Sequence, residues 1–293
     1  MSDNATPTGF AAAVEAAQPS TVRVEAPRCR TLSGTVWAKD LALTSLRGLG
    51  DADEARVVGA DSRELAAEVV GSDAGTDLAL LRVQGELAVT PFRSHDGLRV
   101  GDFALALGRP GKNIRASLRI VGLLADDVRT PAGGRLERYI ETDRGFPDGF
   151  EGGPLIDAHG ALIGVNTSAL IRGADLTIPQ VTLQRVVDEL LTHGRVRRGY
   201  LGVATQPVRL PAALRDSLKQ RSGALVLDTE ADGPAHKAGL TLGDVIVALD
   251  GTPIRGPREL ASALATKLAA TVSLSVVRGG QVVSVQLTTA ERG

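Results

Sequence analysis

The sequence predicts a mainly β chain followed by a separate α+β unit. Between Thr21 and Thr177, short β-branched runs alternate with Gly, Asp and Ser, which favours a barrel or a sandwich of short strands. The apolar period then changes to that of a helix, and a different pattern follows from Tyr200 to Thr289. At 293 residues, the chain is long enough for two or three domains with separate cores.

The first elements are expected in this order. Strong helix formers at Phe10–Ala17 predict a short helix, which Gln18 and Pro19 end. Two series of short strands follow. The first comprises Val22–Glu25, Gly34–Ala38, Leu41–Thr44, Arg56–Gly59, Leu65–Val70 and Leu78–Val83. The second includes Phe103–Leu107, Ser117–Leu124, Arg138–Glu141, Leu155–Ile156 and Leu162–Asn166.

A helix over about 181–193 is expected to close the β region. Its apolar residues recur at i, i+3, i+4, i+7 and i+8, the stripe of a helix with one buried face. They are Leu183, Val186, Val187, Leu190 and Leu191. Gly194 is expected to stop this helix, and the basic residues 195–198 to connect it to the next unit.

Bulk properties exclude several function classes. The chain has 33 Lys and Arg residues against 34 Asp and Glu residues, so its overall charge creates no basic field. Nucleic acid is therefore not expected as a partner. The single cysteine, Cys29, rules out an internal disulfide, and four histidines without metal-ligand spacing predict neither metal nor cofactor. No apolar stretch approaches the roughly 20 residues of a transmembrane helix, and no signal peptide is seen. The expected location is therefore cytoplasmic.

Two segments carry a resemblance to a known family. Tyr139–Asp157 reads Y-I-E-T-D-R-G-F-P-D-G-F-E-G-G-P-L-I-D and resembles the nucleophile loop of the HtrA/Deg serine proteases. Gly233–Ile254 reads G-P-A-H-K-A-G-L-T-L-G-D-V-I-V-A-L-D-G-T-P-I and resembles the core of a PDZ domain. The resemblance implies a trypsin-like double β-barrel followed by an α+β PDZ domain, although members of the family are often exported.

The resemblance also implies domain boundaries. An N-terminal helix or arm is expected at 1–19 and a protease-like domain at 20–195. Within the latter, barrel 1 spans about 20–100, barrel 2 about 101–180 and the closing helix about 181–193. A PDZ domain is expected at 196–293, where Asp250 and Gly251 mark a hairpin and a second helix begins at Pro257. Leu170–Pro179 matches the loop that shapes specificity in relatives, and its polar character predicts no deep apolar pocket.

Three positions match the family's catalytic triad. Arg47 stands in the place of the histidine, Asp77 is in register with the aspartate, and Glu151 stands in the place of the serine. Gly149 matches the oxyanion-hole glycine. Arginine stays protonated and offers no acceptor, so it cannot act as a general base near neutral pH. We therefore predict a degenerate, non-catalytic homologue, a pseudoprotease and not an enzyme.

Two arrangements of these side chains are open. Arg47 can form an ion-pair cluster with Asp77 and Glu151, because a guanidinium with two carboxylates is well satisfied. Alternatively, the replacements arose independently and Arg47 points to solvent. A hydrolase that uses another nucleophile, such as Ser45 or Ser168, is the rival enzyme hypothesis.

The remaining site is expected in the PDZ domain. Tyr200–Val203 reads Y-L-G-V and resembles the carboxylate-binding loop of HtrA-type PDZ domains. Successive N–H groups of this loop can bind a terminal carboxylate, while a peptide adds as a strand beside it. Side chains expected to face the groove are Leu201, Val203 and Leu264.

Together these features predict a scaffold, adaptor or chaperone that binds peptide or protein C-termini and unfolded segments through its PDZ domain. A regulatory subunit of an active protease paralogue is an alternative. The resemblance also implies a homo-oligomer, possibly a trimer, with Phe10 as a candidate contact.

Overall fold

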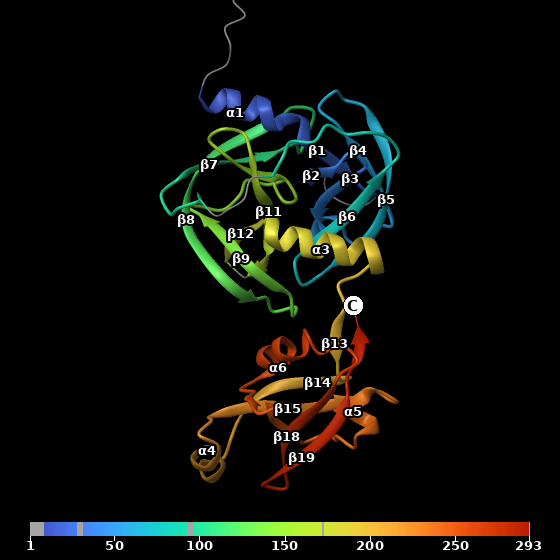
Figure 1. Cartoon of the computed structure of the whole chain (residues 1–293), viewed down its shortest axis with the longest axis vertical. Helices are drawn as coiled ribbons and strands as arrows, with labels where there is room; N and C mark the ends of the chain where they lie inside the picture. The colour runs from blue at the N-terminus through green and yellow to red at the C-terminus, as the bar shows by residue number, and fades with distance from the viewer. Residues whose placement is uncertain (1–8, 28–31, 93–96, 172, 293) are drawn as a thin grey trace, which may run out of the picture. The chain divides into compact units, whose positions relative to one another are not determined.

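The computed structural model describes residues 9–27, 32–92, 97–171 and 173–292 (Figure 1). Cys29 and His95 lie outside these ranges. The chain divides into two compact units, Met1–Val196 and Arg197–Gly293. The predicted fold class is confirmed: the first unit holds two closed six-stranded barrels and the second holds a small sheet with helices.

The first barrel follows the N-terminal helix α1 (Phe10–Ala17) and a 3₁₀ turn (Gln18–Ser20). Its strand order is β1-β2-β3-β6-β5-β4. The bounds are β1 (Thr21–Glu25), β2 (Leu32–Ala38), β3 (Leu41–Ser45), β4 (Glu54–Val58), β5 (Glu64–Asp73) and β6 (Leu78–Val83). A single helical turn, α2 (Leu46–Leu49), leaves the end of β3.

The second barrel has the order β10-β11-β12-β9-β8-β7. Its strands are β7 (Phe103–Gly108), β8 (Arg115–Arg129), β9 (Arg135–Thr142), β10 (Pro154–Asp157), β11 (Leu162–Ile171) and β12 (Ala174–Pro179). The last strand corrects the expectation of a polar loop at Leu170–Pro179, because Leu170, Leu176 and Ile178 are buried.

Helix α3 (Gln180–His193) packs on the barrels, as Figure 1 shows in yellow. Leu183 and Leu190 are fully buried in a core shared with Leu43 of the first barrel and Val165 of the second. Leu191 is 42% exposed, so the predicted stripe is one residue too wide. Gly194 adopts φ 69° and ends the helix, as predicted.

The second unit has a main sheet of order β14-β15-β16-β18-β19, with β17 paired to β16. Its elements are β13 (Arg198–Tyr200), β14 (Val203–Arg209), α4 (Ala212–Leu218), β15 (Ser222–Thr229), α5 (Pro234–Lys237), β16 (Val245–Leu249), β17 (Thr252–Pro253), α6 (Pro257–Leu264), β18 (Thr271–Arg278), β19 (Gln281–Thr288) and β20 (Ala290–Arg292). Strand β13 pairs with β20. In this sheet β14 pairs only with β15, so its other edge is free of strands.

The second unit has its own core. Leu201, Leu249 and Leu274 are each at most 2% exposed and belong to one apolar cluster. Asp250 and Gly251 both have positive φ and form the tight turn between β16 and β17, as their sequence predicts.

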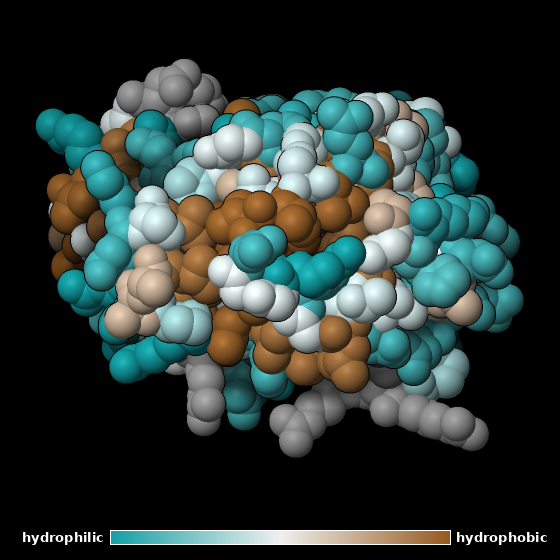
Figure 2. Space-filling view, turned by 90° about the horizontal axis from the view of Figure 1, so that it is seen from below, coloured by the Kyte–Doolittle hydropathy of each residue, from teal (hydrophilic) through white to brown (hydrophobic). Residues whose placement is uncertain are grey.

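Apolar surface also gathers on the face in Figure 2, and this unit exposes the large apolar side chains Leu227, Leu242 and Val282.

Candidate functional site

Asp77 lies at the centre of the candidate site between the two barrels. It precedes β6, whose first residue pairs with Ser45 at the end of β3. Its carboxylate accepts hydrogen bonds from the Ser45 hydroxyl at 2.8 Å and the Thr167 hydroxyl at 2.7 Å. Burial raises the pKa of Asp77, although these hydrogen bonds and the nearby Arg47 oppose the shift.

Arg47 approaches Asp77 through its backbone. Its N–H donates to Asp77 Oδ1 at 2.8 Å, because the Ser45 hydroxyl caps α2 and sets residue 47 beside the carboxylate. No side-chain nitrogen of Arg47 lies within ion-pair distance of Asp77 or Glu151 in the described residues. The expected ion-pair cluster is therefore wrong. Donors that sit closer, two hydroxyls and a backbone N–H, already occupy the Asp77 oxygens.

Glu151 lies in the loop between β9 and β10. Its Oε1 accepts a hydrogen bond from the Ser168 hydroxyl at 2.9 Å. The loop is anchored by Phe150, which is 2% exposed in the core of the second barrel. Gly152 has φ 78°, and a Cβ there would lie 2.4 Å from the Ser33 carbonyl oxygen. Only glycine allows this close approach of the two barrels.

The expected oxyanion position, Gly149, keeps an available donor. Its carbonyl accepts a hydrogen bond from the Ser33 hydroxyl at 2.5 Å, which ties the loop to β2 of the first barrel. Among the described residues, neither the N–H of Gly149 nor that of Glu151 donates to any acceptor. These two N–H groups are therefore available to donate hydrogen bonds to an anionic ligand.

A cavity of about 300 Å³ lies at Arg47 and Ser168. Arg47, at the expected histidine position, lines this cavity. Ser168, the hydrogen-bond partner of Glu151, lines it as well. The other lining residues come from the loops at 74–77 and 130–134 and from β11: Ala74, Thr130, Pro131, Ala132, Ala169, Leu170 and Ile171. Asp77 and Glu151 are not in direct contact with the cavity.

In the second unit, the predicted carboxylate loop joins β13 to β14. The N–H groups of Leu201 and Gly202 donate to no acceptor in the described part of the chain, while their carbonyls accept from Ala235 and Glu230 at 2.8 Å. Leu201 and Leu264 are buried at 1% and 6% exposure, so they form core beneath the loop. Val203 is the only one of the three predicted groove residues that is partly exposed.

A polar cluster beside this loop was not predicted from the sequence. The Tyr200 hydroxyl donates to Glu230 Oε2 at 2.5 Å and accepts from Arg292 Nη1 at 2.6 Å. The Arg292 guanidinium also lies over the Tyr200 ring, 4.6 Å from its centroid. The hydrogen bond to Glu230 raises the pKa of Tyr200. No spacing signal connects three residues so far apart in the sequence.

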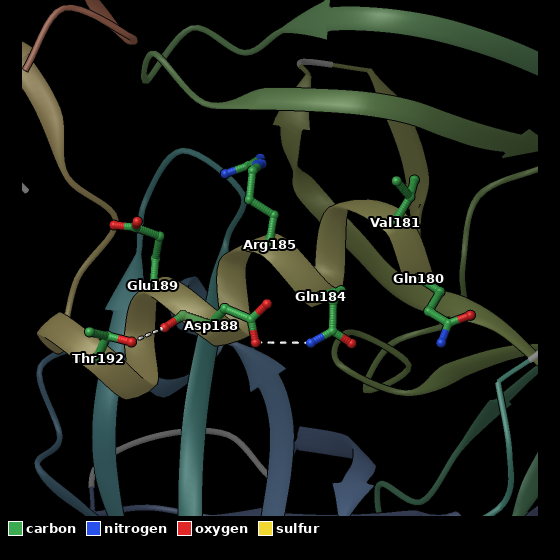
Figure 3. Close-up of a pocket in the computed structure, with 7 residues that line it drawn as sticks. All are labelled: Gln180, Val181, Gln184, Arg185, Asp188, Glu189 and Thr192. Carbon is green, nitrogen blue, oxygen red and sulfur yellow. Dashed lines mark hydrogen bonds between the residues drawn. The ribbon is translucent and has the colours of Figure 1, made fainter.

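A surface hollow of about 640 Å³ follows one side of α3 (Figure 3). Its side chains are mostly polar and partly bonded to one another. Gln184 donates to Asp188 at 2.9 Å, and the Thr192 hydroxyl donates to the Asp188 carbonyl at 2.8 Å. Arg185 pairs with Glu137 at 2.6 Å and so fixes the helix to β9. These bonds indicate a structural role for this helix face.

Within the described ranges, no group of three or more His, Cys, Asp or Glu side chains could hold a metal ion. None of the helices described there is long and apolar enough to cross a membrane.

Comparisons with known proteins agree with both units. Residues 32–165 match a trypsin-like peptidase domain, and residues 199–289 match a PDZ domain. A curated relative from Chlamydia trachomatis, named probable periplasmic serine endoprotease DegP-like, is 34% identical over 265 residues. That match covers 87% of this chain and 53% of the relative. A relative of the same name from Brucella suis is 35% identical and covers 80% of this chain and 47% of its own length.

Solved structures resemble the chain over nearly its whole length, whereas it spans about half the length of the curated relatives. A serine endoprotease from Yersinia pestis superimposes with a TM-score of 0.75 at 28% identity, covering 98% of this chain and 99% of that chain. An HtrA-type protease, AlgW, described with a tripeptide, gives 0.72 at 31% identity and covers 98% of each chain.

These comparisons correct two predictions. The prediction that the chain is not an enzyme is wrong, because its relatives are named serine endoproteases and its structural neighbours are described as proteases. That prediction rests on the replaced side chains at positions 47 and 151, and a hydrolase with another nucleophile, such as Ser45 or Ser168, is its rival. The cytoplasmic location is also wrong, because the curated relatives are named periplasmic, which points to an exported protein.

Proposed function

The chain belongs to the HtrA family of trypsin-like serine proteases with a PDZ domain, and from this premise we propose that it binds peptide C-termini and unfolded protein segments through that domain. It would act as a scaffold, adaptor or chaperone. The observation that carries the proposal is a pair of N–H groups at the start of an edge strand, those of Leu201 and Gly202, which have no acceptor among the residues that the structure describes. A solved relative described with a tripeptide supports it.

The binding mode follows from this geometry. A terminal carboxylate would accept hydrogen bonds from the N–H groups of Leu201 and Gly202, since adjacent backbone donors form a concave anion site. The peptide backbone would then extend β14 along its free edge, and Val203 would contact the last apolar side chain. Buried Leu201 and Leu264 keep the loop in place from below.

Val203→Asp tests this mode. We expect the variant to bind a labelled peptide that ends in a free apolar residue at least about tenfold more weakly than the wild type, because like charges would face each other. Val208→Asp is the matched control, since it lies in the same strand and is also partly exposed. Fluorescence anisotropy with the full chain measures both. Equal losses in the two variants would contradict the proposed site.

We propose that Arg47, Asp77 and Glu151 occupy the family's triad positions, with Gly149 at the oxyanion position. The backbone N–H of residue 47 on Asp77 and the two available N–H groups of the 149–151 loop support this assignment. A guanidinium offers no proton acceptor, so hydrolysis by this chain would have to use a nucleophile outside these three positions.

Ser168 is the candidate for such a nucleophile. Its hydroxyl donates to Glu151 Oε1 at 2.9 Å and lines the cavity, so a hydroxyl and a carboxylate base are already in contact. A fluorophosphonate probe is expected to label the wild type and Ser45→Ala, since Ser45 is buried at 3% exposure, and not Ser168→Ala. Equal labelling of the Ser168→Ala variant and the wild type would eliminate Ser168 as nucleophile.

We also propose that the chain forms a homo-oligomer through the outer face of β7 and β8. Phe103 and Ile120 are cross-strand partners, 51% and 41% exposed, and Phe10 of α1 packs on Phe103 with ring centroids 5.9 Å apart. Exposed apolar side chains gathered in this way are typical of an interface. Light scattering of the full chain checks this, and a monomeric mass would contradict it.

A further inference from the structure

Among the described residues that line the cavity between the barrels, one is charged, Arg47. The Arg47 side chain lines the cavity and has no acidic partner in the described structure. The N–H groups of Gly149 and Glu151 belong to the adjoining loop and are also available, as described above. Arg47 is exposed, and its guanidinium has five N–H donors and no acceptor, so it can bind an acceptor group that enters the cavity from solvent.

Both carboxylates nearby already accept hydrogen bonds from donors other than the Arg47 side chain. Asp77 accepts from the hydroxyls of Ser45 and Thr167 and from the N–H of Arg47, and it does not line the cavity. Glu151 accepts from Ser168, which is itself part of the wall. The ligand that complements the remaining groups is therefore an anion with two oxygens, because the planar guanidinium pairs with a carboxylate in a bidentate manner.

The rest of the wall indicates what carries the carboxylate. Leu170, Ile171 and Pro131 give one side of the cavity an apolar surface. The pairing of β11 with β12 is interrupted between Thr167 and Ile171, directly beside Ser168, which leaves strand backbone there outside the ladder. Irregular strand backbone next to a side-chain pocket suits an extended polypeptide better than a small molecule.

We propose that this cavity binds an acidic side chain, Asp or Glu, of an extended polypeptide segment, with Arg47 as the residue that selects it. This recognition is separate from the PDZ loop, since it needs no free C-terminus. It gives the barrel unit a preference for acidic segments that neither matched domain implies.

The test uses two acetylated, C-terminally amidated peptides that differ in one residue, Glu or Gln, between apolar neighbours. Amidation removes the terminal carboxylate, so the PDZ loop does not contribute to the difference. We expect the full chain to bind the Glu peptide about tenfold more tightly than the Gln peptide, the size of one charge-assisted interaction. The preference should diminish as the salt concentration rises.

Arg47→Gln is expected to abolish the preference, while Arg115→Gln, which removes one exposed charge elsewhere on the same unit, should retain it. Arg47→Lys should keep part of the preference, because it retains the charge and loses the planar fork. Circular dichroism confirms that each variant is folded. A wild type that does not distinguish the two peptides, or an Arg47→Gln variant that still does, would overturn the proposal.

Discussion

The double variant Arg47→His/Glu151→Ser is expected to cleave an unfolded protein substrate about a hundredfold faster than the wild type, or more. It places an imidazole and a hydroxyl at the two replaced positions. General acid–base catalysis by a positioned side chain contributes about 10²–10⁴-fold. The surroundings are already arranged for it. The N–H of residue 47 donates to Asp77, the Thr167 hydroxyl supports the same carboxylate, and the N–H groups of Gly149 and residue 151 are available.

The gain should depend on all three positions. Each single variant supplies only half of the nucleophile–base pair, so neither is expected to exceed the wild type by more than a few fold. Adding Asp77→Asn to the double variant should remove most of the gain. The measurement is kcat/KM on a quenched fluorescent unfolded substrate. A double variant no faster than the wild type would show that the loop does not hold residues 47 and 151 in triad geometry.

Phe150→Ala is expected to be strongly destabilising. Phe150 is 2% exposed in the core of the second barrel, and a Cβ at Gly108 would lie 2.9 Å from its ring. Removing a buried Phe side chain costs about 3–5 kcal/mol, because both transfer energy and packing are lost. The loss would also release Glu151 and Gly149, which flank Phe150 in sequence, from their fixed conformation.

Urea unfolding of the full chain measures this effect. Phe150→Leu should lose clearly less stability than Phe150→Ala, since it keeps most of the apolar volume. Val100→Ala, at a side chain 62% exposed, should change stability by less than about 0.5 kcal/mol. A Phe150→Ala variant as stable as Val100→Ala would mean that the loop is held by other contacts.

Much of the fold could be predicted because local patterns and long-range packing agree. The helix at Phe10–Ala17 and strand β6 have the predicted bounds, and Gly194 and the Asp250–Gly251 turn act as their backbone chemistry requires. Strand β12 was missed, because its buried Leu176 and Ile178 alternate with polar residues that gave the segment a loop-like composition.

The arrangement of the candidate site could not be predicted in the same way. The ion-pair cluster was inferred from the charges and from the triad geometry of the family. In the structure, Asp77 accepts from the Ser45 and Thr167 hydroxyls and from the backbone N–H of Arg47, and Glu151 accepts from the Ser168 hydroxyl. Which donor lies within hydrogen-bond distance of a carboxylate depends on how two strands and a loop that are distant in the sequence pack together. The predictions about enzyme activity and location were wrong for a different reason, because each rested on the absence of an expected signal. For the activity this signal was the catalytic side chains, and for the location it was a signal peptide.

The central claim, that the loop at Leu201–Val203 captures a free carboxyl terminus, is tested most directly with one peptide in two forms. Isothermal titration of the full chain compares an apolar peptide with a free C-terminal carboxylate and the same peptide amidated. We predict that the free acid binds about tenfold more tightly or better, because its charge satisfies the N–H groups of Leu201 and Gly202. Equal affinity for the acid and the amide would contradict the claim.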